Sequence, residues 1–131
     1  MNDNFIFRII IAISVITFTG WVFLPFVQFV WYPQLIIDIT SYDGYGSLVD
    51  IPNYIIWAII LLKVIILFGV ACYNRTARLL FLVYTLLTLA LVAFSGMRAQ
   101  TSIESFMLDL SNISDGLIIG LAYFSYYRDK F

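Results

Sequence analysis

Four apolar stretches, each about as long as a membrane-spanning helix, nearly fill this 131-residue chain. A helix needs roughly 20 mostly apolar residues to cross the hydrocarbon core of a bilayer. Only 11% of the residues are charged, whereas a soluble domain usually carries about 25%. Lipid should therefore face most of the surface, and no room is left for a separate soluble domain. The sequence predicts an all-α, polytopic membrane protein with a single domain over residues 1–131.

The four stretches predict a four-helix transmembrane bundle, and prolines mark the limits of the first two. Pro33 follows the first stretch, and Pro52 precedes the second, where proline is tolerated at a helix start. Pro25 lies inside the first stretch and is expected to kink it, because proline removes a backbone hydrogen bond. The predicted spans are residues 5–30, 54–73, 77–96 and 105–126.

Basic residues predict the orientation of the bundle, because cytoplasmic loops carry an excess of Lys and Arg. When the spans alternate in direction, five basic residues fall on one side, namely Arg8, Arg75, Arg78, Arg128 and Lys130. The opposite side is mainly acidic. Both termini are therefore predicted to be cytoplasmic, with residues 31–53 forming a longer extracytoplasmic loop between helices 1 and 2. The compact loops and short tails favour a bacterial inner membrane.

Lys63 and Asp115 each lie in the middle of an apolar stretch, where an ionisable side chain is costly. Lys63 is nine residues inward from Tyr54, and Asp115 is ten residues inward from Ser105. At about 1.5 Å per residue, both lie roughly 14 Å below the outer boundary, near the midplane of a ~30 Å core. We predict that the two side chains form an intramembrane ion pair.

The fourth span carries polar residues that should face protein or a wet cavity rather than lipid. Asp109, Asn112 and Asp115 lie on one side of this predicted helix. Together with Lys63 they make up a predicted polar seam. We expect Asn112 to complete the hydrogen bonds of the ion pair, together with hydroxyl groups from other spans. The candidate hydroxyls are those of Ser14, Thr17, Thr85 and Thr88.

Two roles are open for the polar seam. It can lock helices 2 and 4 in register, since buried ion pairs more often fix geometry than add stability. It can also form a proton or ion relay. Asp109 lies closer to the outer surface and can reach water there. On the same helix, Gly116 and Gly120 form a small-xxx-small pattern that we expect to pack inside the monomer.

Several kinds of chemistry are excluded by residue types that the chain lacks. Histidine is absent, and Cys72 is the only cysteine. These counts remove the usual haem ligand, the commonest zinc ligand, the most frequent general base and any internal disulfide. The net charge of −1 argues against a nucleic-acid partner, because phosphate binding needs a basic face. We predict no catalytic residues, no metal and no cofactor, and therefore a protein that is not an enzyme.

In its organisation the chain resembles the small bacterial inner-membrane proteins that confer immunity to membrane-targeting toxins, such as the immunity partners of colicins and of contact-delivered effectors. The resemblance covers the whole chain in length, predicted spans and small loops. It implies a non-enzymatic protein that binds another membrane protein or peptide within the bilayer. Two alternatives stay open: a small proton- or ion-coupled transporter or channel, and an accessory subunit of a larger membrane complex.

Overall fold

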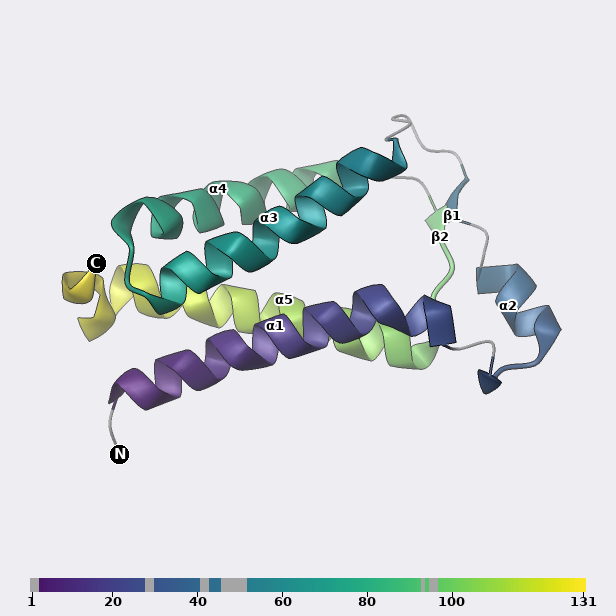
Figure 1. The fold of residues 1–131 in the computed structure, drawn as a ribbon, viewed down its shortest axis with the longest axis horizontal. Helices are drawn as coiled ribbons and strands as arrows, with labels where there is room; N and C mark the ends of the chain where they lie inside the picture. Colours follow the sequence, from purple (N-terminus) through teal and green to yellow (C-terminus); the bar gives the residue numbers. More distant parts are fainter. Residues whose placement is uncertain (1–2, 28–29, 41–42, 46–51, 93, 95–96) are drawn as a thin grey trace.

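Four long helices lie along the longest axis of the molecule (Figure 1). They are α1 (Asp3–Val27), α3 (Asn53–Ala71), α4 (Arg75–Val92) and α5 (Ser102–Phe124). This computed structural model describes all of the chain except residues 1–2, 28–29, 41–42, 46–51, 93 and 95–96. Within the described part, α1, α3 and α4 are long and apolar enough to cross a membrane. The chain thus has the helices of a membrane protein.

The four long helices occupy the four predicted stretches, but their ends differ from the prediction. α1 ends at Val27 rather than at residue 30, soon after Pro25, which lies in its last turn. α4 ends at Val92 rather than at residue 96, and the backbone N–H of Phe94 bonds back to the carbonyl of Leu91 in a turn. α3 ends at Ala71, two residues before the predicted limit. Residues 28–29, 93 and 95–96 of the predicted spans lie outside the described residues, and α4 begins at Arg75, two residues before its predicted start.

A capping box explains why α5 begins earlier than predicted, at Ser102 rather than at residue 105. The Thr101 hydroxyl accepts the backbone N–H of Glu104 at 3.3 Å. The Glu104 carboxylate accepts the backbone N–H of Thr101 at 2.7 Å. This reciprocal arrangement satisfies two backbone donors that the first turn of a helix leaves without partners.

The predicted outer loop, residues 31–53, contains regular structure. A short helix, α2 (Gln34–Thr40), is followed by the strand β1 (Asp43–Tyr45). β1 pairs antiparallel with β2 (Met97–Arg98), which lies between α4 and α5. Figure 1 places this ribbon at the end of the molecule far from both chain termini. The fold is thus helical, as predicted, with a small ribbon that joins two connections at one end.

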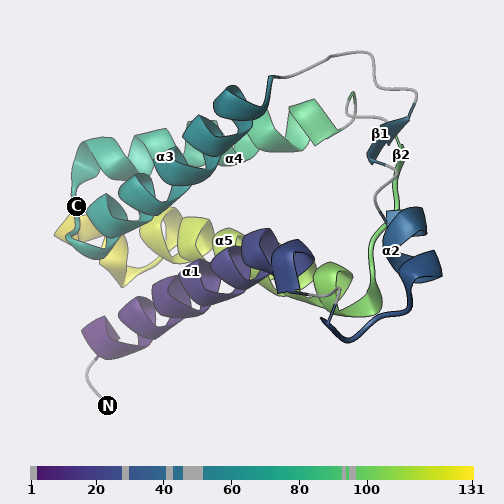
Figure 2. The ribbon, with the colours of Figure 1, turned by 45° about the vertical axis from the view of Figure 1, so that its right-hand side comes forward.

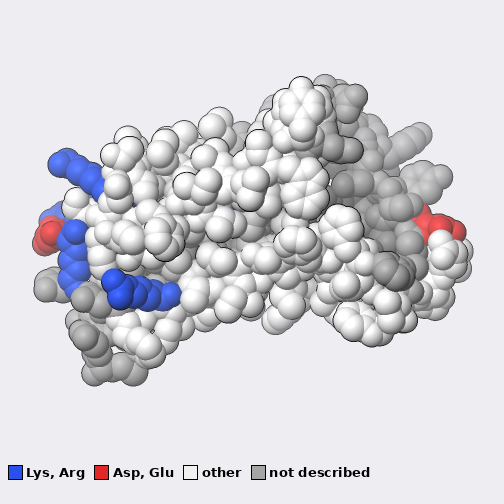
Figure 3. All heavy atoms as spheres, viewed as in Figure 1, with Lys and Arg blue, Asp and Glu red and all other residues white. Residues whose placement is uncertain are grey.

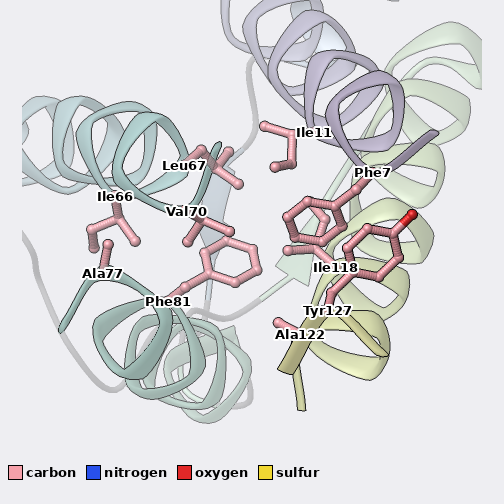
Figure 4. Packing of buried hydrophobic residues seen from close by; sticks show 10 residues of the cluster. All are labelled: Phe7, Ile11, Ile66, Leu67, Val70, Ala77, Phe81, Ile118, Ala122 and Tyr127. Atoms are coloured by element: carbon pink, nitrogen blue, oxygen red, sulfur yellow. The ribbon is translucent and has the colours of Figure 1, made fainter. Parts of the chain in front are cut away.

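The long helices form two pairs, α1 with α5 and α3 with α4. The pairs lie close together near the chain termini and diverge toward the β strands (Figure 2). The main hydrophobic cluster follows this shape, because its members other than Tyr127 come from the half of each long helix nearest the termini (Figure 4). Its buried side chains are Phe7, Ile11, Ile66, Leu67, Val70, Ala77, Phe81, Ile118, Ala122 and Tyr127.

The C-terminal segment closes this end of the bundle. After α5 the chain forms a short 3-10 helix, η2 (Tyr126–Lys130). The Tyr127 ring stacks on Phe7 of α1 with 4.9 Å between centroids. Phe131 meets the Tyr73 ring edge-on at 5.5 Å. These aromatic contacts tie the chain end to α1 and to the turn between α3 and α4.

A tight turn joins α3 to α4. Tyr73 has a φ of 57°, the left-handed conformation in which many helices end. The Asn74 side chain then accepts the backbone N–H groups of Thr76 and Ala77 at 2.9 and 3.2 Å, which caps α4. A β-carbon at Gly69 would lie 2.6 Å from the Ala77 Cβ. Only glycine at this position allows the two helices to approach so closely.

We expect Gly69→Ala to lower the free energy of unfolding by about 1–3 kcal/mol, the usual cost of overpacking. Gly120→Ala is the matched control, because a β-carbon there would meet nothing within 4 Å. Both substitutions favour the helix to a similar extent. The difference between their stabilities in detergent therefore reports the close approach of α3 and α4. Equal stability of the two variants would contradict it.

Candidate functional site

A buried ion pair links α3 to α5. The Lys63 Nζ atom is 2.6 Å from the Asp115 Oδ2 atom. Only 4% of Lys63 and 5% of Asp115 is exposed. The predicted pair is therefore present, and it connects the α3–α4 pair of helices to the α1–α5 pair. Removing two such charges from water is offset only when their geometry is good and further hydrogen bonds satisfy them.

Two buried serines supply those further hydrogen bonds. Ser14 of α1 donates its hydroxyl to the Asp115 Oδ1 atom at 2.5 Å. The Lys63 ammonium donates to the Ser111 hydroxyl at 3.1 Å. Both serines are fully buried. The four residues Ser14, Lys63, Ser111 and Asp115, here called the polar cluster, therefore join three helices through polar bonds.

Asn112 was predicted to complete the ion pair, and the structure corrects this. Asn112 is exposed, and Ser111 takes the position beside Lys63. Adjacent residues of an α-helix point roughly 100° apart, since 3.6 residues make a turn. A rotation of α5 that turns both Ser111 and Asp115 inward therefore carries Asn112 outward. The polar seam as predicted is thus divided between two sides of α5.

Of the four hydroxyls proposed for the ion pair, only that of Ser14 reaches it. The three threonine hydroxyls donate instead to carbonyl groups one turn earlier in their own helices. Thr17 bonds to the carbonyl of Ile13 at 2.8 Å, Thr85 to that of Phe81 at 2.9 Å and Thr88 to that of Tyr84 at 3.0 Å. Such local bonds give the threonine hydroxyl an acceptor within its own helix, so it needs no hydrogen-bond partner from another helix.

Asp109 also lies outside the polar cluster, on the exposed side of α5. In the described chain, nothing lies within 4 Å of a β-carbon placed at Gly116 or Gly120. The expectation that these glycines pack inside the monomer is therefore wrong. The physical reason is the rotation of α5, whose inward side carries Ser111, Asp115 and Ile118 instead.

Apolar side chains close the polar cluster. The Lys63 Nζ atom lies 4.1 Å from the centroid of the Phe18 ring, close enough for a cation–π interaction. One turn toward the chain termini, each of the three contributing helices presents a buried apolar residue: Ile11, Leu67 and Ile118. The ammonium and carboxylate are thus bonded to each other, to two serines and to a ring. This arrangement can hold α1, α3 and α5 in a fixed register.

The five predicted cytoplasmic determinants gather at the end of the molecule near the chain termini, where Figure 3 shows Lys and Arg side chains. Arg78 has a further role that the sequence did not reveal. It donates to the carbonyls of Ala122 and Arg128 at 3.2 and 3.3 Å. Its guanidinium also lies 4.8 Å from the centroid of the Tyr123 ring. Arg78 therefore fastens the end of α5 and the C-terminal segment to α4.

Among the residues that the structure describes, no group of three His, Cys, Asp or Glu side chains is close enough to hold a metal ion. Comparisons with protein-family models, curated proteins and solved structures find no match.

We expect Lys63→Met to lower the free energy of unfolding by about 3–5 kcal/mol, because it leaves the Asp115 carboxylate buried and unpaired. The double variant Lys63→Met, Asp115→Leu should recover most of this loss, since it removes both charges and puts apolar side chains in their place. Unfolding of the purified proteins in mixed detergent micelles measures both values. A double variant no more stable than the single one would contradict the assigned pairing.

Proposed function

We propose that the chain is a four-span protein of a bacterial inner membrane, with both termini in the cytoplasm. The length of α5 and its packing along α1 support α5 as the fourth span, because α1 is itself apolar enough to cross a membrane. The ion pair neutralises the buried carboxylate of α5. The basic residues at the terminal end support the orientation, since positive charge marks the cytoplasmic side. α2 and the β ribbon then lie on the outer side.

Cys72 gives a direct test of this orientation, because it is the only cysteine and is exposed at the terminal end of α3. We expect a membrane-impermeant maleimide to label Cys72 in permeabilised spheroplasts and not in intact ones. The matched variant carries Cys72→Ser and Gln34→Cys, which moves the thiol to α2. This variant should be labelled in intact spheroplasts. The reverse labelling pattern would overturn the orientation.

We further propose that the protein is not an enzyme and acts by binding another membrane protein or peptide within the bilayer. The division of polar residues on α5 carries this proposal. Ser111 and Asp115 are buried and bonded within the chain. The side chains of Asp109 and Asn112 are exposed and hydrogen-bond to no described residue. An unpaired aspartate in the hydrocarbon core raises the cost of insertion, by up to about 2.5–3.5 kcal/mol at the centre of a helix, and a binding partner can remove this cost.

We propose immunity to a membrane-targeting toxin as the role of this binding. The layout of the chain, with short loops and no recognisable catalytic set, supports this role through its resemblance to toxin-immunity proteins. The closed polar cluster favours binding over transport, because Lys63 and Asp115 already satisfy each other and are covered by apolar side chains. Membership of a larger membrane complex would use the same kind of lateral surface.

Photo-crosslinking in the native host tests the binding function. A photoreactive amino acid is placed at one outward-facing position in each long helix, namely Ile16, Ile65, Leu86 or Ile113, all of which are exposed. We expect a discrete protein adduct from at least one position, because a bound partner must cover part of this surface. The same amino acid at the fully buried Leu67 is the control and should give no intermolecular adduct.

Failure to obtain an adduct at any of the four positions would contradict the binding function. Ion flux through liposomes provides a second criterion. Flux that the wild-type protein carries and the Asp115→Asn variant loses would assign the chain to transport instead. We expect both proteins to match empty liposomes, since Asp115 is already committed to Lys63 and Ser14.

A further inference from the structure

One side of α5 carries polar and small residues that the rest of the described chain leaves uncovered. Asp109, Asn112, Gly116 and Gly120 follow one another at spacings of three and four residues, which places them along one side of a helix. The carboxylate and the amide are exposed, and the space beside both glycines is open. These four residues are here called the open face of α5.

The open face lies at membrane depth when α5 spans the bilayer. Relative to Asp115 at the midplane, Asn112 lies about 4.5 Å and Asp109 about 9 Å nearer the outer surface. Both values fall inside the ~15 Å half-thickness of the hydrocarbon core. Ionisable residues at such depth pair with other groups or line a wet path. We therefore expect another polar or charged group to pair with Asp109 and Asn112 at the open face.

The described basic side chains of the chain do not supply this group. Lys63 is bonded to Asp115 and Ser111 on the buried side of α5. The remaining described basic side chains lie at the terminal end of the bundle, away from Asp109: Arg8, Arg75, Arg78, Arg128 and Lys130. Among the described side chains none supplies a cation to Asp109, and another molecule within the membrane can do so.

We propose that the open face of α5 binds a transmembrane helix of another protein that carries a lysine or arginine in its outer third, where it meets Asp109 and Asn112. This inference rests on the proposed binding function and adds the chemistry of the partner. The chain uses the same chemistry internally, where Lys63 of α3 meets Asp115 and Ser111 of α5. The partner repeats on one side of α5 what α3 does on the other.

The glycines define the shape of the partner below its basic residue. Gly116 and Gly120 have no side chain, so a second backbone can approach α5 closely along this stretch. The partner therefore presents small residues one to two turns inward of its lysine or arginine. A second copy of this chain fits less well, because parallel α5 helices would bring one Asp109 beside another without a cation.

Peptide binding in phosphatidylcholine vesicles tests the proposal with the full-length protein. The protein carries a fluorophore on Cys72, and the probe is a labelled leucine-rich transmembrane peptide with one lysine in its outer third. We expect energy transfer to show about tenfold tighter binding of this peptide than of the same peptide with leucine at that position, the size of an interhelical polar contact in model systems. Asp109→Leu should abolish the preference.

Two matched controls separate the open face from general effects. Asp129→Leu removes a carboxylate from the terminal end and should keep the preference for the lysine peptide, since Asp129 is exposed beside Arg128. Gly116→Ile should weaken binding of the lysine peptide, whereas Ala58→Ile, which places the same side chain at an exposed position of α3, should not. Thermal unfolding of each variant confirms that the fold is retained.

Equal binding of the lysine and leucine peptides, or a preference that persists in Asp109→Leu, would overturn the proposal. Self-association of the labelled protein that Gly116→Ile abolishes, without any preference for lysine, would assign the open face to a second copy and would also overturn it. The proposed function is judged separately. Adducts from Ile16, Ile65 or Leu86 combined with a negative peptide assay would retain a binding protein that uses another face.

Discussion

The ion pair between Lys63 and Asp115 determines which helices of this chain touch. Lipid tails are as apolar as leucine side chains, so apolar helices in a bilayer gain little from burying apolar surface against each other. A polar bond is therefore a strong discriminator among possible helix arrangements. Here the bond spans the two helix pairs, because Lys63 belongs to α3 and Asp115 to α5. Ser14 extends the selection to α1. The polar cluster fixes the register of these helices, and the main hydrophobic cluster packs beside it, nearer the chain termini.

The two ends of the molecule are built differently. At the terminal end, Tyr127 stacks on Phe7, and Arg78 holds both the end of α5 and the C-terminal segment. This end is closed by side chains from most of the long helices. Toward the other end the helix pairs diverge, and the backbone pairing of β1 with β2 joins the two outer connections (Figure 2). The polar cluster lies between a tightly packed half and a more open one, and it limits how far the pairs can separate.

Much of this arrangement could be predicted from sequence, because it depends on the lengths of the apolar stretches and on the depths of Lys63 and Asp115 within them. Four apolar stretches locate the helices, and counting residues from the stretch boundaries brings Lys63 level with Asp115. The rotation of α5 could not be obtained in the same way. Its polar residues surround more than one side of the helix, so the sequence permits Asn112 to point inward as readily as Ser111. The packing of α5 against α1 and α3 determines which of the two residues points inward, and the sequence of α5 alone does not contain this information.

Other differences between the sequence prediction and the structure also arise from tertiary contacts. The start of α5 is the exception, because a local sequence pattern indicates it. The contact of Tyr127 with Phe7 joins opposite ends of the sequence, and no local sequence pattern predicts it. The pairing of β1 with β2 likewise joins short segments that are far apart in the chain. The start of α5 was different, because a threonine followed three positions later by a glutamate is a known signature of a helix start. Thr101 and Glu104 form that signature, whereas hydropathy alone places the start of the helix at residue 105.

The separation of the ion pair along the chain has a consequence for biogenesis. Lys63 and its carboxylate partner are 52 positions apart in the sequence. A ribosome that adds about 5–20 residues per second needs roughly 3–10 s to cover this distance. Throughout that interval the nascent α3 helix holds an ammonium group without its counter-ion. The leucines and isoleucines around Lys63 offset the cost of this unpaired charge, because each makes insertion of the helix into the membrane more favourable. Assembly of the bundle is therefore completed late, when α5 has been synthesised and its carboxylate neutralises the Lys63 ammonium.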